Sequence, residues 1–240
     1  MCAQWHSWPT LELASEACAR WIAQKLESAL SIRGHASVAI SGGTTPRLLF
    51  ECLAVMRLGW PHIHVFWVDE RLVLPCDPES NFRLAYETLI GPAGIPPANV
   101  HRVRGELSPD EAVRRYVGDV RRFFKLGRGE LPRFDVMHCG IGADTHTASL
   151  FPGDPRIHDR TGIAATVYVP KLSQWRVTLL PGPIVNAAHT AVLAAGNDKA
   201  EAVRSVFTEQ YAPIRYPAQL NCRLSAFWFL DAAAARFLRQ

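Results

Sequence analysis

Ser37-Val38-Ala39-Ile40-Ser41-Gly42-Gly43-Thr44-Thr45-Pro46 is the stretch from which the fold can be read. It begins with an apolar run of strand length, continues through two glycines, and ends in a proline that suits the first turn of a helix. The apolar residues after it recur with helical spacing, at Leu48, Leu49, Cys52, Leu53 and Met56. The stretch therefore predicts a strand, a tight turn and a helix.

The same order of elements recurs along the chain. An apolar run over residues 64–68 ends in Asp69-Glu70-Arg71, and another over 134–139 ends in a glycine-rich segment. Four more runs have strand length, at 165–169, 176–180, 190–195 and 225–230, and helical patterns cover 10–32, 109–126 and 198–207. Strands that alternate with helices predict an α/β fold with a mostly parallel sheet covered on both faces. In such sheets, ligands bind beyond the carboxyl ends of the strands.

The composition is that of a globular protein. The chain has 240 residues, of which 48% are hydrophobic and 20% charged, so we expect residues 1–240 to form a single domain. The net charge of +4 suits an anionic ligand without indicating nucleic acid. The densest basic stretch alternates with apolar residues at helical spacing, which indicates the solvated face of an amphipathic helix; its cations are Arg114, Arg115, Arg121, Arg122 and Lys125.

The six cysteines stand far apart, without the C-x-x-C spacing of zinc ribbons or redox motifs. The N-terminus shows no basic region leading into an apolar run, and no uncharged apolar stretch approaches the roughly 20 residues that a membrane-spanning helix requires. We therefore expect a cytoplasmic protein with reduced thiols, no membrane partner and no nucleic-acid partner.

The turn Ser41-Gly42-Gly43-Thr44-Thr45-Pro46 has the features of a phosphate site. Its glycines leave backbone N–H groups unobstructed, its hydroxyls can donate, and a helix begins directly after it. The turn lacks the Gly-Lys-Ser/Thr ending of a P-loop and the third glycine of a dinucleotide fingerprint. An ordinary tight turn explains the same residues, so both interpretations stay open.

Asp69-Glu70-Arg71 places two carboxylates and a guanidinium at a strand end. The arginine could hold a phosphate or stabilise an oxyanion while the carboxylates orient it; a surface ion pair is the plainer alternative. Downstream, Ser80-Asn81-Phe82 is explained as a helix start capped by Ser80 or Asn81.

Asp144 and His146 lie in Gly140-Ile141-Gly142-Ala143-Asp144-Thr145-His146-Thr147-Ala148-Ser149. Residues two apart point in different directions on a helix, so an irregular loop is needed to turn both side chains to one ligand. Histidine changes charge near neutral pH, which makes the pair a candidate acid/base site. Isolated histidines are usually structural, but the glycines and the strand-end position favour function for His146.

Lys199 also follows a strand and opens a helix, where a cation opposes the helix dipole unless an anion shares the site. Arg176, at the start of another apolar run, is uninformative on its own. The chain contains neither the G-x-S-x-G elbow of a serine hydrolase nor the H-E-x-x-H pair of a zinc protease, so the sequence gives no support to these two chemistries.

Together these residues resemble the 6-phosphogluconolactonase family, within the superfamily that also holds glucosamine-6-phosphate deaminases. The matching blocks occur in the expected order, at 41–46, 67–71 with 80–82, 140–153 and 196–200. The most specific of them is His146-Thr147-Ala148-Ser149-Leu150-Phe151-Pro152-Gly153. The resemblance implies a Rossmann-like three-layer α/β/α sandwich that hydrolyses 6-phospho-D-glucono-1,5-lactone to 6-phosphogluconate in the oxidative pentose phosphate pathway, with no metal and no organic cofactor.

The resemblance also implies roles for individual residues. His146 would activate water for attack on the lactone carbonyl, and Asp144 would set its orientation and basicity. Arg71 would bind the anion or stabilise the oxyanion, with Asp69 positioning it. The 6-phosphate would be held by Gly42, Gly43, Thr44, Arg176 and Lys199.

Two departures from the family pattern stand out. Thr145 occupies a position where family members usually have glycine, and a β-branched residue in the left-handed region would cost on the order of 1–2 kcal/mol. Leu179-Leu180-Pro181-Gly182-Pro183 replaces the more usual Thr-Leu-Thr continuation, which puts the neighbouring wall of the pocket in question.

Two alternatives accompany this interpretation. An amino-sugar-phosphate deaminase or isomerase would carry a Glu shortly after the Asp-x-His element, where this chain has Phe151. A non-catalytic sugar-phosphate sensor would need a DNA-binding module, for which residues 1–10 leave no room. We therefore expect a lactonase that binds a small sugar-phosphate lactone and acts as a monomer.

Overall fold

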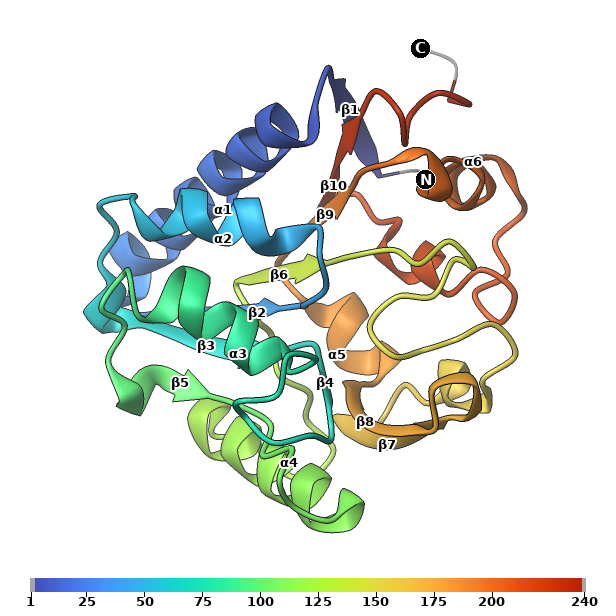
Figure 1. The fold of residues 1–240 in the computed structure, drawn as a ribbon. Coiled ribbons are helices and arrows are strands. Elements are labelled where there is room, and N and C mark those ends of the chain that lie inside the picture. The colour runs from blue at the N-terminus through green and yellow to red at the C-terminus, as the bar shows by residue number, and fades with distance from the viewer. Residues whose placement is uncertain (1–2, 239–240) are drawn as a thin grey trace.

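The computed structural model describes residues 3–238 and is built on a seven-stranded parallel sheet (Figure 1). The strands lie in the order β1-β10-β9-β6-β2-β3-β5. Their bounds are β1 Gln4–Trp8, β2 Ala36–Ile40, β3 Ile63–Trp67, β5 Val100–His101, β6 Val136–Cys139, β9 His189–Ala194 and β10 Ala226–Asp231. The expectation of a mostly parallel α/β sheet is confirmed, whereas β1 and β5 were not predicted.

The central strands are apolar because helices cover both faces of the sheet. Every residue of β2 and of β6 is buried, so their sequences are largely apolar, with Ser37 and His138 as the polar exceptions, and do not alternate. In Figure 1, α1 (Leu11–Arg33) and α2 (Pro46–Ala54) lie above these strands, and α4 (Pro109–Phe124) and α5 (Pro181–Asn186) lie below them.

Local signals define the helix ends. Thr10 caps α1 by accepting a hydrogen bond from the Leu13 amide (3.4 Å), and Gly34 ends the helix in the left-handed region. The remaining helices are α3 (Asn81–Ala85), which continues into a π-helical turn over Tyr86–Ile90, and α6 (Ala200–Thr208). On α4, Glu111 pairs with Arg114 and Arg115, which agrees with the predicted solvated basic face.

A second, three-stranded sheet departs from the expected architecture. Strands β4 (Asp69–Arg71), β8 (Gln174–Leu179) and β7 (Ala164–Val169) pair antiparallel in the order β4-β8-β7. The runs at 165–169 and 176–180 are therefore strands, as predicted, but they lie outside the parallel sheet. Asp69-Glu70-Arg71 is itself a strand and not only the end of one.

The two most informative loops meet because β2 and β6 are neighbours at the centre of the sheet. The chain continues outward from β2 to β3 and β5 on one side and from β6 to β9 and β10 on the other, where β1, the first strand of the chain, forms the edge. Such a switch in strand order opens a crevice at the carboxyl ends of the strands. The loops 41–45 and 140–146 flank that crevice.

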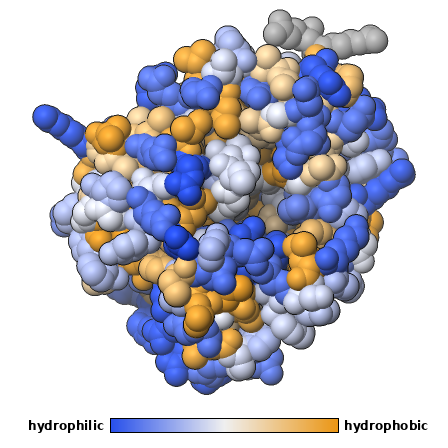
Figure 2. Space-filling view, in the orientation of Figure 1, coloured by the Kyte–Doolittle hydropathy of each residue, from blue (hydrophilic) through white to orange (hydrophobic). Residues whose placement is uncertain are grey.

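Figure 2 shows hydrophilic side chains and smaller apolar groups interspersed over one face of the molecule. Among the described residues, none of the helices is both long and apolar enough to cross a membrane.

Candidate active site

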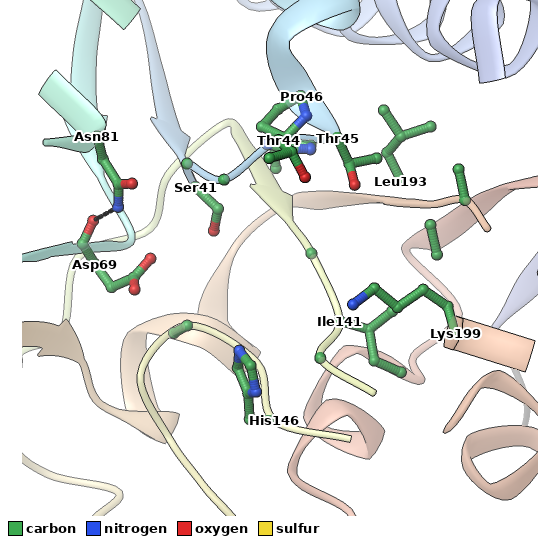
Figure 3. Close-up of a pocket in the computed structure, with 18 of the residues that line it drawn as sticks. Ser41, Thr44, Thr45, Pro46, Asp69, Asn81, Ile141, His146, Leu193 and Lys199 are labelled. Atoms are coloured by element: carbon green, nitrogen blue, oxygen red, sulfur yellow. Dashed lines mark hydrogen bonds between the residues drawn. The ribbon is translucent and has the colours of Figure 1, made fainter. Parts of the chain in front are cut away.

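A cavity of about 260 Å³ lies at the carboxyl ends of β2 and β6 (Figure 3). It brings together eight of the nine residues predicted for the site: Gly42, Gly43, Thr44, Asp69, Arg71, His146, Arg176 and Lys199. Asp144, the ninth, stands behind His146 and is hydrogen-bonded to its ring. In Figure 3, the Thr44 loop lies across the cavity from His146, with Lys199 on a third side.

The loop after β2 needs its first glycine because Asn81 approaches closely. A Cβ at Gly42 would stand 1.9 Å from Asn81 Oδ1, so any larger residue would displace the Asn81 side chain. That side chain donates a hydrogen bond to the Asp69 carbonyl (2.9 Å), drawn in Figure 3. Gly43 lies at φ 104°, a conformation that favours glycine. The loop and the start of α3 therefore form one packed wall.

Glu70 joins strand β4 to helix α3. It is 1% exposed, and its carboxylate accepts hydrogen bonds from the amides of Arg71 (2.8 Å), Asn81 (2.8 Å) and Phe82 (2.7 Å). Burial raises the pKa of Glu70 to about 7, although these backbone hydrogen bonds oppose the shift. Ser80 is the helix cap, since its hydroxyl accepts from the Arg83 amide (3.2 Å). Glu70 thus holds the start of α3 against strand β4, although its side chain does not line the cavity.

Asp69 and Arg71 have separate partners. The buried Asp69 carboxylate accepts a hydrogen bond from the Ser149 hydroxyl (2.7 Å), and the Ser149 amide donates to the Thr178 hydroxyl (3.1 Å). The Arg71 guanidinium donates instead to the Glu79 carbonyl (2.5 Å). The hydrogen bond that orients Arg71 therefore comes from Glu79, whereas Asp69 holds the loop that carries His146.

Arg176 lies directly opposite Arg71 in the antiparallel pair β4–β8. It is 7% exposed, and burial, together with the nearby Arg71, lowers its pKa, while Asp69 and Glu79 act in the opposite direction. Two guanidinium groups therefore give this wall of the cavity a positive charge that suits an anion.

The irregular loop expected around His146 is present and is closed by two backbone hydrogen bonds. The Gly142 amide donates to the His146 carbonyl (2.9 Å), and the Thr145 amide donates to the Gly142 carbonyl (2.9 Å). Within it, His146 Nδ1 lies 2.6 Å from Asp144 Oδ1, and Phe151 packs against the imidazole at 4.7 Å between ring centres. The hydrogen bond with His146 lowers the pKa of Asp144 to about 2. Asp144 is therefore ionised at neutral pH and occupies one ring nitrogen, leaving Nε2 for the cavity.

Thr145 adopts φ 71°, the left-handed conformation that its family position suggested. Its carbonyl accepts a hydrogen bond from the Ala218 amide (2.9 Å), and its hydroxyl donates to the Arg215 carbonyl (3.4 Å). The loop thus keeps the geometry of a glycine-containing one, and contacts with the 215–218 segment offset part of the strain.

Lys199 lies at the start of α6 and pairs with Asp198, at 3.0 Å between Nζ and Oδ2. Figure 3 shows the ammonium group pointing into the cavity. The cation next to the helix N-terminus is thus partly balanced by a neighbouring carboxylate and remains available to an anion.

The departure at 179–183 lies away from the cavity, because none of those residues lines it. A Cβ at Gly182 would stand 2.6 Å from the Arg160 carbonyl, so this segment packs against the loop around residue 160. The departure at 179–183 therefore does not change the wall of this cavity.

Half of the buried side-chain polar atoms that have no hydrogen-bond partner among the described residues belong to residues that line the cavity. They include Ser41 Oγ, Arg71 Nε, Asn81 Oδ1 and both ring nitrogens of His138. Unpaired buried groups are costly, and they are tolerated at sites that a ligand or water completes. Within residues 3–238 there is no group of three or more His, Cys, Asp or Glu side chains that could hold a metal ion.

Several residues of the site were not predicted from the sequence. Ser149 stands in the same run as His146 and could have been noticed as a buried polar partner. Asn81 was interpreted only as a possible cap, although its side chain turns toward Asp69 and Gly42. Glu79, Gln174 and Asp198 carry no local signal, because their roles depend on contacts made in the folded chain.

This chain is similar to known proteins in both sequence and fold. A family model described as glucosamine-6-phosphate isomerases/6-phosphogluconolactonase matches residues 9–228. A 6-phosphogluconolactonase from Synechocystis is 35% identical over 91% of each chain, and one from Haemophilus influenzae is 32% identical over 97% of this chain and 98% of the other. The crystal structure of a 6-phosphogluconolactonase from Leishmania guyanensis superposes with a TM-score of 0.83 at 27% identity, covering 100% of both chains.

Proposed function

The chain belongs to the family of glucosamine-6-phosphate isomerases and 6-phosphogluconolactonases, and on that premise we propose that it hydrolyses 6-phospho-D-glucono-1,5-lactone to 6-phosphogluconate. This reaction opens the lactone ring in the oxidative branch of the pentose phosphate pathway. The relatives that carry the 6-phosphogluconolactonase name match nearly the full length of this chain.

One observation carries the proposal. His146 has its Nδ1 held by the ionised Asp144, and its ring borders a cavity that also contains Arg71, Arg176 and Lys199. A general base that faces several cations suits a substrate in which a reactive neutral carbonyl and an anionic phosphate belong to the same molecule.

In the proposed reaction, Nε2 of His146 removes a proton from water as the water oxygen attacks the lactone carbonyl carbon. Asp144 holds the ring in place and stabilises the positive charge that develops on it. The tetrahedral intermediate then collapses, the bond from the carbonyl carbon to the ring oxygen breaks, and the ring oxygen takes a proton from His146. Arg71 stabilises the oxyanion, and Asp69 acts through Ser149 on the loop that carries His146.

The phosphate occupies the other side of the cavity in this proposal. Gly42, Gly43 and Thr44 offer backbone and hydroxyl donors at the start of α2, and Lys199 and Arg176 contribute positive charge. Binding the remote phosphate orients the lactone relative to His146, which lowers the entropic part of the barrier.

A deaminase or isomerase is less well supported. Phe151, which stands where those enzymes would carry the additional Glu, packs on the His146 ring. Among the described residues, the carboxylates that line the cavity are Asp69 and Asp198, and the latter pairs with Lys199. An apolar ring beside the base does not shuttle protons.

We propose further that residues 1–240 act as one domain and as a monomer in the cytoplasm. The hydrophobic core runs from α1 through the sheet to β10, which supports a single folding unit. A single copy of the chain forms a cavity that contains eight of the nine proposed site residues, which supports action as a monomer. Cys18, Cys52, Cys76 and Cys139 are free thiols, as is usual in a reducing compartment.

The test is an assay of freshly generated 6-phosphogluconolactone with the spontaneous rate subtracted. The wild-type protein should accelerate loss of the lactone, and His146→Ala should reduce kcat by about 10²–10⁴-fold with unchanged folding. Activity on glucosamine 6-phosphate without activity on the lactone would refute the assignment.

A further inference from the structure

Arg71 and Arg176 pose an electrostatic problem that their strand pairing creates. Side chains directly opposite each other in an antiparallel pair lie on the same face, and like charges in this arrangement repel. Arginine side chains are long and flexible, so two of them in the wall of one cavity need anchors to converge on a ligand.

Each guanidinium is anchored, and both anchors lead to one residue. Arg176 Nε donates to Gln174 Oε1 (3.2 Å), and Gln174 Nε2 donates in turn to Glu79 Oε2 (2.9 Å). The main-chain carbonyl of the same Glu79 accepts from Arg71 Nη1 (2.5 Å). Glu79 is itself held by Asp77, whose carboxylate accepts from the Glu79 amide (2.8 Å). The chain of contacts forms a bridge between strand β8 and the loop that follows β4.

We propose that Gln174 and Glu79 are positioning residues that set the directions of Arg71 and Arg176 for binding the anionic substrate. The inference rests on the proposed function, because it assigns these two arginines to a sugar-phosphate ligand. Neither residue of the bridge lines the cavity, so each acts through an arginine and not by touching the ligand.

The amide at position 174 suits this task. A glutamine side chain accepts with Oε1 and donates with Nε2 at once, so it can join a guanidinium to a carboxylate. By using only Nε of Arg176, it leaves the terminal nitrogens of that group for a phosphate. A carboxylate at 174 would still accept from Arg176 but would repel the carboxylate of Glu79.

The decisive variant is Gln174→Ala, with Gln24→Ala, an exposed change on α1, as the matched control. We measure the Kd for 6-phosphogluconate by calorimetry and kcat and KM for the lactone. Gln174→Ala should raise Kd and KM by about three- to tenfold while kcat stays within about twofold, because ground-state binding is what it weakens. A purely structural role would lower thermal stability without this split. Unchanged Kd and KM in an active protein would overturn the inference while leaving the proposed function intact.

A swap of the two bridge groups provides the rescue. Gln174→Glu alone places two carboxylates face to face and should raise Kd by about tenfold or more, whereas Gln174→Glu with Glu79→Gln restores a donor–acceptor pair and should return Kd to within about threefold of wild type. Equal impairment of the single and double variants would show that the 174–79 contact does not matter. A wild-type protein that neither hydrolyses the lactone nor binds 6-phosphogluconate would instead refute the proposed function, and the inference with it.

Discussion

Gly142 lies directly against the imidazole of His146. A Cβ built on Gly142 would stand 2.0 Å from His146 Nδ1 and 2.6 Å from Asp144 Oδ1. The absence of a side chain at 142 is therefore what allows the carboxylate and the imidazole to come within 2.6 Å of each other. The glycine-rich composition of this loop has a steric cause at that position.

Gly142→Ala should consequently disable the site. The methyl group forces the ring away from Asp144, and misplacement of a catalytic group by about 1 Å can cost on the order of 10²-fold in rate. Gly118→Ala on α4 is the control, since a Cβ at Gly118 meets no atom within 4 Å and Gly118 does not line the cavity. We expect kcat/KM for the lactone to fall by about 10²-fold in the first variant and to stay within about threefold in the second. Equal activity of the two would contradict the steric account.

Asp144→Asn tests the charge beside the base. The pKa of Asp144 is about 2, so in the wild type this group is ionised throughout the range from pH 5 to 8 and contributes no titration there. Removing its charge should lower kcat by about 10- to 10³-fold at every pH in that range, because the positive charge developing on His146 loses its partner. A rate loss confined to one end of the pH range would argue against this role.

Lys199→Met tests the phosphate end of the cavity. The methionine keeps most of the side-chain volume and removes a positive charge from the lining of the cavity. We expect KM for the phosphorylated lactone and Kd for 6-phosphogluconate to rise by about tenfold or more, as for loss of a charge-assisted hydrogen bond. Arg20→Met, an exposed cation on α1, is the control. If Lys199→Met treated phosphorylated and unphosphorylated lactones as the wild type does, Lys199 would not bind the phosphate.

Comparing the stabilities of two variants at position 145 measures the free-energy cost of the left-handed backbone conformation of Thr145. Thr145→Ala keeps the strain at φ 71° and loses the hydroxyl contact with Arg215, whereas Thr145→Gly loses the same contact and relieves the strain. The glycine variant should therefore be more stable than the alanine variant by about 1 kcal/mol in urea unfolding. Equal stabilities would mean that the loop relaxes around residue 145 at no cost.

His138 should make the protein sensitive to acid. Burial lowers the pKa of this histidine to about 4 in the folded state, against an ordinary value of about 6.5 in the unfolded chain. The unfolded state therefore binds the proton first as the pH falls, and about 3 kcal/mol of stability is lost between pH 6.5 and pH 4. His138→Leu should reduce the slope of the unfolding free energy against pH in this range by the equivalent of about one bound proton. His62→Leu, at an exposed position, should not. The measurement is the free energy of unfolding of both variants and the wild type from pH 4.5 to 8. An unchanged slope in His138→Leu would show that His138 does not cause the acid sensitivity.

Local sequence predicted most of the helices and strands and the polar loops that follow the strands, although it missed β1 and β5. The largely apolar runs before Ser41, Asp69 and Gly140 identified strands because both faces of a central strand in a parallel sheet are covered. Glycine, proline and polar residues after those runs marked the loops, since turn conformations place specific demands on single residues. Capping at Thr10 and the left-handed Gly34 follow from the same kind of short-range chemistry.

Only the folded chain decided which side chains meet. Ser149 reaches Asp69 across 80 residues, and Gln174 reaches Glu79 across 95. The antiparallel register of β4 with β8, which sets Arg71 opposite Arg176, left no trace in periodicity because a three-residue strand is too short to show one. Spacing along the chain predicts local conformation, whereas the partners of a side chain depend on sheet register and packing. The sequence therefore indicated eight residues that meet at one cavity, but not the network of contacts that orients them.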